Sequence, residues 1–271
     1  MIILKDTKMN IIVFSKDRAA QLDLFMRSMV EYFSEYIDFK IYVIYTYSSN
    51  VFKKGYDELI KLYEDINFIT ETNFKKDVLS TIDPNLKFTT FFVDDIIWKE
   101  SFSINDDKFI LFEQSTDILC LSLRLNSNLN YCYAANHSMT LPISYDNGVW
   151  NWRGERGDYG YPMSLDGHIF KTQDILPLLQ RLIYKNPNQL EAMLSYSPIN
   201  KPKMMCYDKS KIINNPANKV QTNNPNKHGS ISAEYINEQF LKGYMIDLEP
   251  YRNINNTQCH LEMPINFIKD E

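Results

Sequence analysis

Apolar residues follow two alternating periods over the first third of the chain. Nearly continuous runs of β-branched and aromatic residues occur at residues 11–14, 39–47, 66–70 and 88–93. Between them, apolar residues recur every three to four positions, as on one face of an amphipathic helix, at residues 22–33, 56–63 and 73–82. Strands that alternate with helices form a largely parallel sheet with right-handed crossovers. The pattern therefore predicts an α/β fold.

The rest of the chain carries fewer periodic segments. An apolar stripe at residues 175–183 predicts a core-packed helix, and residues 232–248 predict a terminal helix that Ser232 caps. The stretch from residue 214 to 225 is rich in asparagine and proline, which predicts a loop. A lid that orders over a bound ligand is one interpretation of this loop.

Charged and polar residues follow two of the predicted strands. Residues 15–18 come directly after the first strand, and Asp94 and Asp95 come directly after the fourth. Ligands of parallel α/β sheets collect beyond the carboxyl ends of the strands, so both groups are expected at one site. Adjacent carboxylates repel each other and are costly to desolvate, so they need a cation or hydrogen-bond donors. A divalent metal that also holds a diphosphate would serve, whereas a turn-capping pair of aspartates is the structural alternative.

Several common functions are excluded by what the sequence lacks. No glycine precedes Gly55, so the turn after the first strand is not a G-x-G-x-x-G dinucleotide loop, and no P-loop motif occurs. Lysine and arginine number 29 against 34 acidic residues, a formal charge of -5, which disfavours nucleic-acid and anionic-membrane partners. We expect no nucleic-acid partner.

Cysteine usage and hydropathy bear on the compartment. The four cysteines form no C-x-x-C pair, which favours reduced thiols over a disulfide framework or a zinc knuckle. No run of eighteen or more apolar residues occurs, and the N-terminus does not resemble a signal peptide. We therefore expect a soluble, cytoplasmic protein without a membrane span.

Four motifs in order carry a family resemblance. The first strand ends in Ser15-Lys16-Asp17-Arg18, like an S-x-x-R start, and Phe92-Val93-Asp94-Asp95 lies about where a D-x-D motif would stand. Residues 165–176 are similar to a G-x-x-F-R-x-x-x-L strand and helix, and Asn188-Gln189-Leu190-Glu191 lies where a helix begins with an acidic x-E-D motif. Over residues 10–230 the chain thus resembles the nucleotide-sugar-dependent glycosyltransferases of GT-A fold, close to the family 2 type.

The resemblance implies a fold, a reaction and a donor site. It implies a GT-A domain in which residues 1–100 form the donor-binding half, and residues 101–271 form the acceptor-binding half with a C-terminal loop and helix. The implied reaction transfers a sugar from a nucleoside diphosphate sugar, with a UDP-sugar as first expectation, to a glycan or other hydroxyl acceptor. It implies inversion and a Mn²⁺ or Mg²⁺ cofactor. Asp95 would hold the metal, and the donor would contact Ser15, Asp17, Arg18 and Asp94.

The catalytic base has two candidates in the sequence. Glu191 matches the acid of the family motif, although Ala192 replaces the second acid of the usual pair. Its structural alternative is an ordinary acid in the first turn of a helix. Asp166, in Asp166-Gly167-His168, is the competing carboxylate, with a turn residue before glycine as its alternative. The two carboxylates of the family's D-x-D motif are also adjacent here rather than two apart.

Further residues are assigned more loosely. His228 resembles the C-terminal histidine that completes the metal site in many GT-A enzymes, with a solvated loop histidine as the alternative. Trp150, Trp152 and Asp158 lie in a glycine-rich aromatic segment and could line an acceptor subsite, or the rings could pin the segment to the core. Arg124 is interpreted as a strand-edge or helix-surface residue rather than a diphosphate ligand. No partner is evident for His260.

Two other functions stay open. A sugar nucleotidyltransferase shares the nucleotide-binding sheet and the metal carboxylates, but it usually has a glycine-rich basic signature after the first strand, which is absent here. A catalytically inactive carbohydrate-binding protein of similar fold is the second alternative.

Overall fold

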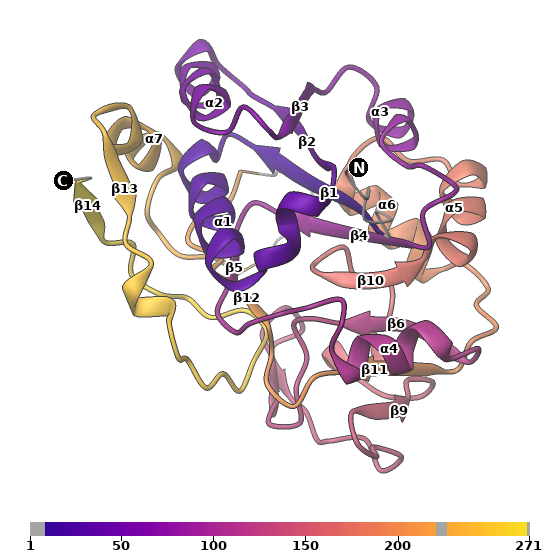
Figure 1. Cartoon of the computed structure of the whole chain (residues 1–271). Helices are drawn as coiled ribbons and strands as arrows, with labels where there is room; N and C mark the ends of the chain where they lie inside the picture. Colours follow the sequence, from indigo (N-terminus) through magenta and orange to yellow (C-terminus); the bar gives the residue numbers. More distant parts are fainter. Residues whose placement is uncertain (1–8, 221–226, 270–271) are drawn as a thin grey trace, which may run out of the picture.

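An eight-stranded sheet runs through the molecule in the order β3-β2-β1-β4-β10-β6-β11-β9 (Figure 1). The computed structural model describes residues 9–220 and 227–269. The strands of this sheet are β1 (Met9–Lys16), β2 (Ile41–Thr46), β3 (Asn67–Thr70), β4 (Phe88–Val93), β6 (Ile118–Ser122), β9 (Val149–Asn151), β10 (His168–Lys171) and β11 (Lys203–Cys206).

The sheet is mostly parallel. Strands β1 to β4 pair in parallel with one another, and β6 pairs in parallel with β11. Strand β10 lies antiparallel between β4 and β6, and β9 closes the far edge antiparallel to β11. The predicted α/β fold with a largely parallel central sheet is confirmed.

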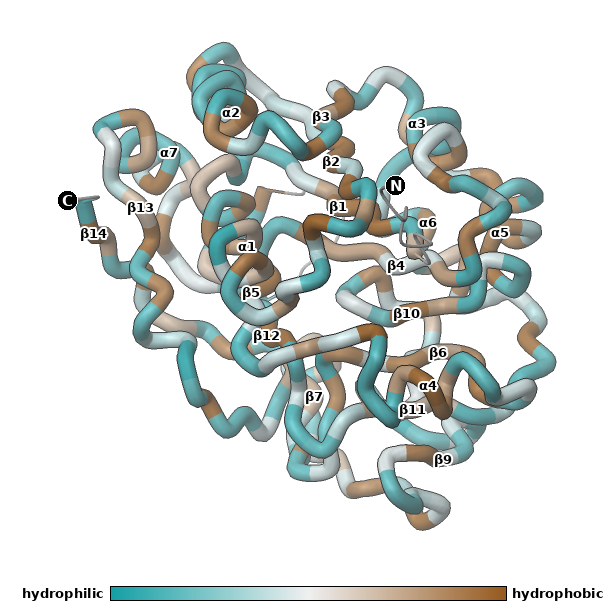
Figure 2. The backbone as a smooth tube through the Cα atoms, viewed as in Figure 1, coloured by the Kyte–Doolittle hydropathy of each residue, from teal (hydrophilic) through white to brown (hydrophobic). Residues whose placement is uncertain are grey.

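Helices cover both faces of the sheet because the strands alternate their side chains between two cores. Ile11 and Val13 of β1 point into one core, whereas Ile12 and Phe14 point into the other. The first core packs against α1 (Ala19–Tyr32), α2 (Asn50–Leu62), α4 (Asp107–Gln114) and α7 (Ala233–Leu241). The second packs against α3 (Phe74–Ser80), α5 (Thr172–Arg181) and α6 (Pro187–Ser195). Brown apolar segments of the backbone tube in Figure 2 follow these buried strands and helix faces.

The C-terminal helix is shorter than the sequence predicts. The Ser232 side chain caps α7 as expected, accepting a hydrogen bond from the Tyr235 N–H. The helix ends at Leu241, because Gly243 adopts a φ of +81°, which reverses the chain. The chain then forms β13 (Tyr244–Ile246), which pairs with β14 (Phe267–Lys269).

Short strands bring segments that are distant in sequence to the end of the sheet at which the parallel strands terminate. Strand β12 (Ile212–Asn214) pairs with β5 (Ile96–Trp98), directly after the two aspartates, and β7 (Tyr131–Cys132) pairs with β8 (His137–Ser138). An isolated bridge between Asn214 and His260 places the C-terminal segment beside β12. Within residues 9–220 and 227–269, no helix has the length and apolar character needed to cross a membrane.

Candidate active site

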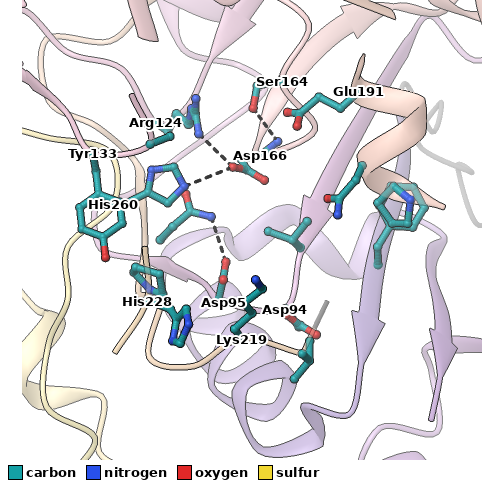
Figure 3. Close-up of a pocket in the computed structure, with 18 of the residues that line it drawn as sticks. Asp94, Asp95, Arg124, Tyr133, Ser164, Asp166, Glu191, Lys219, His228 and His260 are labelled. Carbon is teal, nitrogen blue, oxygen red and sulfur yellow. Dashed lines mark hydrogen bonds and ion pairs between the residues drawn. The ribbon is translucent and has the colours of Figure 1, made fainter. Parts of the chain in front are cut away.

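A cavity of about 900 Å³ opens at the carboxyl ends of the parallel strands. Its lining includes Ser15 and Lys16 from β1, Thr46 from β2, and Asp94 and Asp95 after β4. These are the positions at which the sequence places a ligand site. Figure 3 shows the cavity with two groups of charged side chains, which lie at separate ends.

Donors satisfy every oxygen of Asp94. Its Oδ2 accepts hydrogen bonds from the Ser15 hydroxyl at 2.9 Å and the Lys16 backbone N–H at 3.1 Å, and its Oδ1 accepts one from Arg18 at 3.0 Å. The carboxylate is nonetheless buried, and burial raises its pKa to about 6, since the attraction of Arg18 offsets the desolvation only in part and Asp95 adds repulsion.

Arg18 is the cation that the adjacent carboxylates need. One nitrogen, Nη1, donates to Asp94 at 3.0 Å and to Asp95 Oδ2 at 3.1 Å. Asn214 completes Asp95 by donating to Oδ1 at 3.0 Å. The Nε of Arg18 donates to the Asn218 side chain at 2.8 Å, so the same guanidinium ties the segment after β12 to the aspartates. The start of the predicted 214–225 loop therefore lies at the site, whereas residues 221–226 lie outside the described residues.

A second charged cluster surrounds Arg124. Its guanidinium donates from Nη2 to Asp158 Oδ1 and from Nη1 to Asp166 Oδ2, both at 2.9 Å. Only 3% of Arg124 is exposed, so the interpretation of this residue as a strand-edge or helix-surface arginine is wrong. It lies just beyond β6, where the strand end points into the cavity.

Glu191 lies beside this cluster but has no cation of its own. Its Oε1 accepts a hydrogen bond from the Leu165 backbone N–H at 3.1 Å. Burial raises the pKa of Glu191 to about 7, and the negative charge of Asp166 contributes to the rise. Burial raises the pKa of Asp166 too, against the opposing charge of Arg124. A carboxyl group with a pKa near neutrality can both accept and release a proton under physiological conditions.

The position of Glu191 within its helix removes one alternative. The Asn186 side chain caps α6 by accepting from the Gln189 N–H, and Pro187 is the first helical residue. The first turn of α6 contains no acidic residue, because Glu191 comes in the second turn. The interpretation of Glu191 as an acid that stabilises the helix N-terminus is therefore wrong.

Two histidines line the cavity between and beside the clusters. His260 lies 3.8 Å from Asp166 Oδ2 through Nε2, and its ring stacks on Tyr133 with centroids 5.7 Å apart. Burial lowers the pKa of His260, and nearby Arg124 lowers it further. His228 is exposed, and its Nδ1 is 2.7 Å from the Gly229 carbonyl oxygen, which leaves Nε2 directed to other partners.

Three predicted contact residues do not line the cavity. Trp150 is 1% exposed and donates from Nε1 to the Tyr159 carbonyl, and Trp152 donates from Nε1 to the Lys201 carbonyl. Both rings anchor the aromatic segment to the core. This is the structural alternative to an acceptor subsite. Asp17 has a φ of 56°, and its carboxylate accepts from the Ser48 N–H at 2.7 Å, which joins the ends of β1 and β2. By contrast, Asp158 lines the cavity.

The side chains near Asp95 offer few of the ligands that a protein-only metal site needs. Across the described residues, no group of three or more histidine, cysteine, aspartate or glutamate side chains is arranged to hold an ion. All oxygens of Asp94 and Asp95 already accept hydrogen bonds from Ser15, Lys16, Arg18 or Asn214. Carboxylates that already accept these hydrogen bonds fit an ion that is held mainly by the phosphates of a nucleotide and by one carboxylate, as is common for Mg²⁺. They do not fit an ion that is held by protein ligands alone.

One curated relative is similar to almost the whole chain. It is the bifunctional glycosyltransferase pgtA of Dictyostelium discoideum, which is 25% identical over 290 residues, covering 92% of this chain. The match spans only 37% of the relative's length. The resemblance of the sequence to glycosyltransferases is thereby confirmed. No protein-family model matches the chain.

Solved structures give weaker likenesses. TarS of S. aureus superimposes with a TM-score of 0.47 and 14% identity over 76% of this chain and 36% of TarS. A cytidylyltransferase from Leptospira borgpetersenii superimposes with a TM-score of 0.37 and 12% identity over 70% of each chain. Likenesses at this level carry no argument about activity.

Proposed function

We propose that the protein is an enzyme that transfers a sugar from a nucleoside diphosphate sugar to an acceptor hydroxyl. One observation carries the proposal: the same cavity contains a carboxyl group with a pKa of about 7 and, at its other end, two aspartates with an arginine. A base for the acceptor and a charged site for the leaving diphosphate are the two requirements of this reaction. The similarity to a glycosyltransferase over 92% of the chain supports the same conclusion.

The donor end is proposed to lie at the carboxyl ends of β1 and β4. Lys16, Arg18 and Lys219 line the cavity there and supply positive charge for a diphosphate. Ser15 donates a 2.9 Å hydrogen bond to Asp94, and both would contact the nucleotide. All of these except Lys219 come from residues 1–100, which supports the assignment of that half to the donor. UDP is the finer proposal for the nucleotide.

Glu191 is proposed as the base in preference to Asp166. The Asp166 carboxylate is bound to Arg124, so taking up a proton would weaken an ion pair, whereas Glu191 has no such pair. Glu191 would remove the proton of the acceptor hydroxyl while the acceptor oxygen bonds to the anomeric carbon of the donor. The bond from that carbon to the diphosphate oxygen breaks, and the diphosphate leaves with the electron pair.

Figure 3 draws Glu191 and the two aspartates at separate ends of the cavity, which supports attack opposite the leaving group and hence inversion.

A divalent ion is proposed to act with the nucleotide. Asp95, with His228 as a second candidate, would hold Mn²⁺ or Mg²⁺, and the ion would supply neutralisation of the charge that develops on the diphosphate. Lys16, Arg18 and Lys219, which line the cavity at this end, would share in this neutralisation. The ion is therefore expected to strengthen nucleotide binding rather than to be its only determinant.

Calorimetry with UDP is expected to show binding that Mn²⁺ strengthens. The Asp95→Asn variant keeps the side-chain shape but loses the ligand charge and one of the two hydrogen bonds that Asp95 accepts, so the gain from Mn²⁺ should shrink about tenfold or more, while binding without metal changes less. If neither UDP nor other nucleoside diphosphates bind with or without Mn²⁺ or Mg²⁺, the donor site is refuted and a carbohydrate-binding protein becomes the better interpretation. Release of pyrophosphate from a nucleoside triphosphate and a sugar 1-phosphate would instead indicate a nucleotidyltransferase.

The rate of transfer is expected to fall on the acid side of neutrality. Glu191 must be deprotonated to act as the base, and its pKa is about 7. Below pH 7, kcat/KM should therefore fall with decreasing pH, and the fall should approach tenfold for each pH unit. The measurement is kcat/KM between pH 5.5 and 8.5, with intact fold verified by circular dichroism at each pH. A rate that is constant across this range would rule out Glu191 as the group that accepts the proton.

A further inference from the structure

The end of the cavity that contains Glu191 carries an excess of negative charge. Four carboxylates line it, and two cations accompany them: the lining acids are Glu155, Asp158, Asp166 and Glu191, and the cations are Arg124 and Lys227. Lys227 is exposed, with its ammonium over the Tyr133 ring, so solvent screens much of its charge. His260 also lines this end, and burial lowers its pKa, which favours the neutral ring.

The buried members of this group cannot be screened in the same way. Arg124 is 3% exposed and Asp158 is 4% exposed, so their field acts through protein rather than through water. Arg124 forms its two ion pairs with Asp158 and Asp166, so Glu191 forms no ion pair with it when it is ionised. Asp158 Oδ2 has no hydrogen-bond partner at bonding distance in the described part of the chain.

Resting on the proposed function, we infer that the acceptor is a neutral or amino-bearing polyol, such as an uncharged sugar or an amino sugar. Hydroxyl groups donate to carboxylate oxygens, and the ring of Tyr161, which lines this end, offers apolar surface to the C–H face of a sugar. A carboxylate, sulfate or phosphate on the attacked ring would be desolvated beside several like charges. The cavity therefore selects the acceptor by its charge.

Paired acceptors test the inference directly. The full chain is incubated with a nucleotide sugar that it hydrolyses slowly without acceptor, and transfer is measured to 4-nitrophenyl β-glucoside against the β-glucuronide, and to the β-galactoside against its 6-sulfate. The neutral member of each pair is expected to be preferred about ten- to a hundredfold. Equal or faster transfer to the anionic member overturns the inference. Hydrolysis of the donor reports on the proposed function independently of any acceptor.

A thiol probe measures the charge of this end without knowledge of the acceptor. Cys132 lines the cavity, and burial raises the pKa of its thiol, with the Asp158 carboxylate adding to the rise. Its rate of reaction with cationic 2-aminoethyl and anionic 2-sulfonatoethyl methanethiosulfonate is measured by mass spectrometry. Each rate is divided by the rate for free cysteine. The cationic reagent is expected to be favoured about tenfold or more, and Glu155→Gln is expected to reduce that preference.

Controls separate the two proposals. Cys132→Ala identifies the signal, because Cys132 is 4% exposed and lines the cavity, whereas the other three cysteines are 0% exposed, do not line it and are expected to react more slowly. A normalised ratio at or below one overturns the inference even if the protein transfers sugars. Conversely, a strong preference for the cationic reagent without hydrolysis of any nucleotide sugar would support the charge of this end and reject the proposed function.

Discussion

Replacement of Glu191 by glutamine is expected to lower the rate of sugar transfer about 10²- to 10⁴-fold. The amide is isosteric and still accepts from the Leu165 N–H through its oxygen, but it cannot take a proton from the acceptor. Nucleotide binding should stay within about twofold, since Glu191 lies at the opposite end of the cavity from Asp94 and Asp95. The measurements are kcat, KM and the Kd of UDP.

Two further variants decide how the result is interpreted. Glu58→Gln removes an exposed carboxylate on α2 and should leave the rate unchanged. Asp166→Asn removes the competing carboxylate. If Asp166→Asn loses more than a hundredfold in kcat with its fold intact, while Glu191→Gln keeps most of the rate, the base is Asp166 and the assignment made here is wrong.

The first half of the fold follows from local sequence patterns. Each strand and helix up to residue 93 is marked by its own apolar period, and β4 begins and ends where the run of Phe88–Val93 does. The site residues of this half could be found because they directly follow strands: Ser15, Arg18, Asp94 and Asp95 all line the cavity. Their position depends only on where a parallel strand ends, which a sequence shows.

The second charged cluster could not be found in the same way. Arg124 stands between Leu123 and Leu125, and its partners Asp158 and Asp166 come 34 and 42 residues later. The contact between Arg124 and these two aspartates depends on the path of the chain through residues 125–165. No local sequence pattern encodes that path. His260 is a similar case, since its place at the cavity depends on the bridge between the C-terminal segment and Asn214.

The role of the aromatic segment could not be predicted from the sequence, for a different reason. A tryptophan that stacks on a sugar and a tryptophan that anchors a loop need the same residue type, often between the same glycines. Only the tertiary structure separates them, and it buries Trp150 to 1% exposure. The need of Asp94 and Asp95 for a cation was predictable, but its source was not: the metal was the expectation, whereas Arg18 already bridges the pair from 76 and 77 residues away.

Arg124→Met is expected to destabilise the fold by about 3–5 kcal/mol. Methionine preserves much of the side-chain volume but leaves Asp158 and Asp166 buried without their shared cation. Without the opposing charge of Arg124, burial would raise the pKa of Asp166 further in the folded state, and Asp158 would be left as a buried charge without a partner cation. The ionised forms would then cost stability at every pH above the pKa values of the unfolded chain, and protonation would relieve that cost as the pH falls. The loss relative to the natural chain should therefore be largest near pH 8 and smaller near pH 5.

Urea unfolding at pH 8, 7, 6 and 5 measures this difference, because the midpoint and the slope together give the free energy of unfolding. Lys61→Met is the control: it breaks the exposed pair with Glu58 and should cost a small fraction of the Arg124 loss, with little dependence on pH. Arg124→Met combined with Asp158→Asn and Asp166→Asn should recover part of the stability, since neither position then carries a buried carboxylate without a cation. If Arg124→Met costs no more than Lys61→Met, or if its cost grows as the pH falls, the two carboxylates do not depend on Arg124 for their charge, and the electrostatic account of this end of the cavity fails.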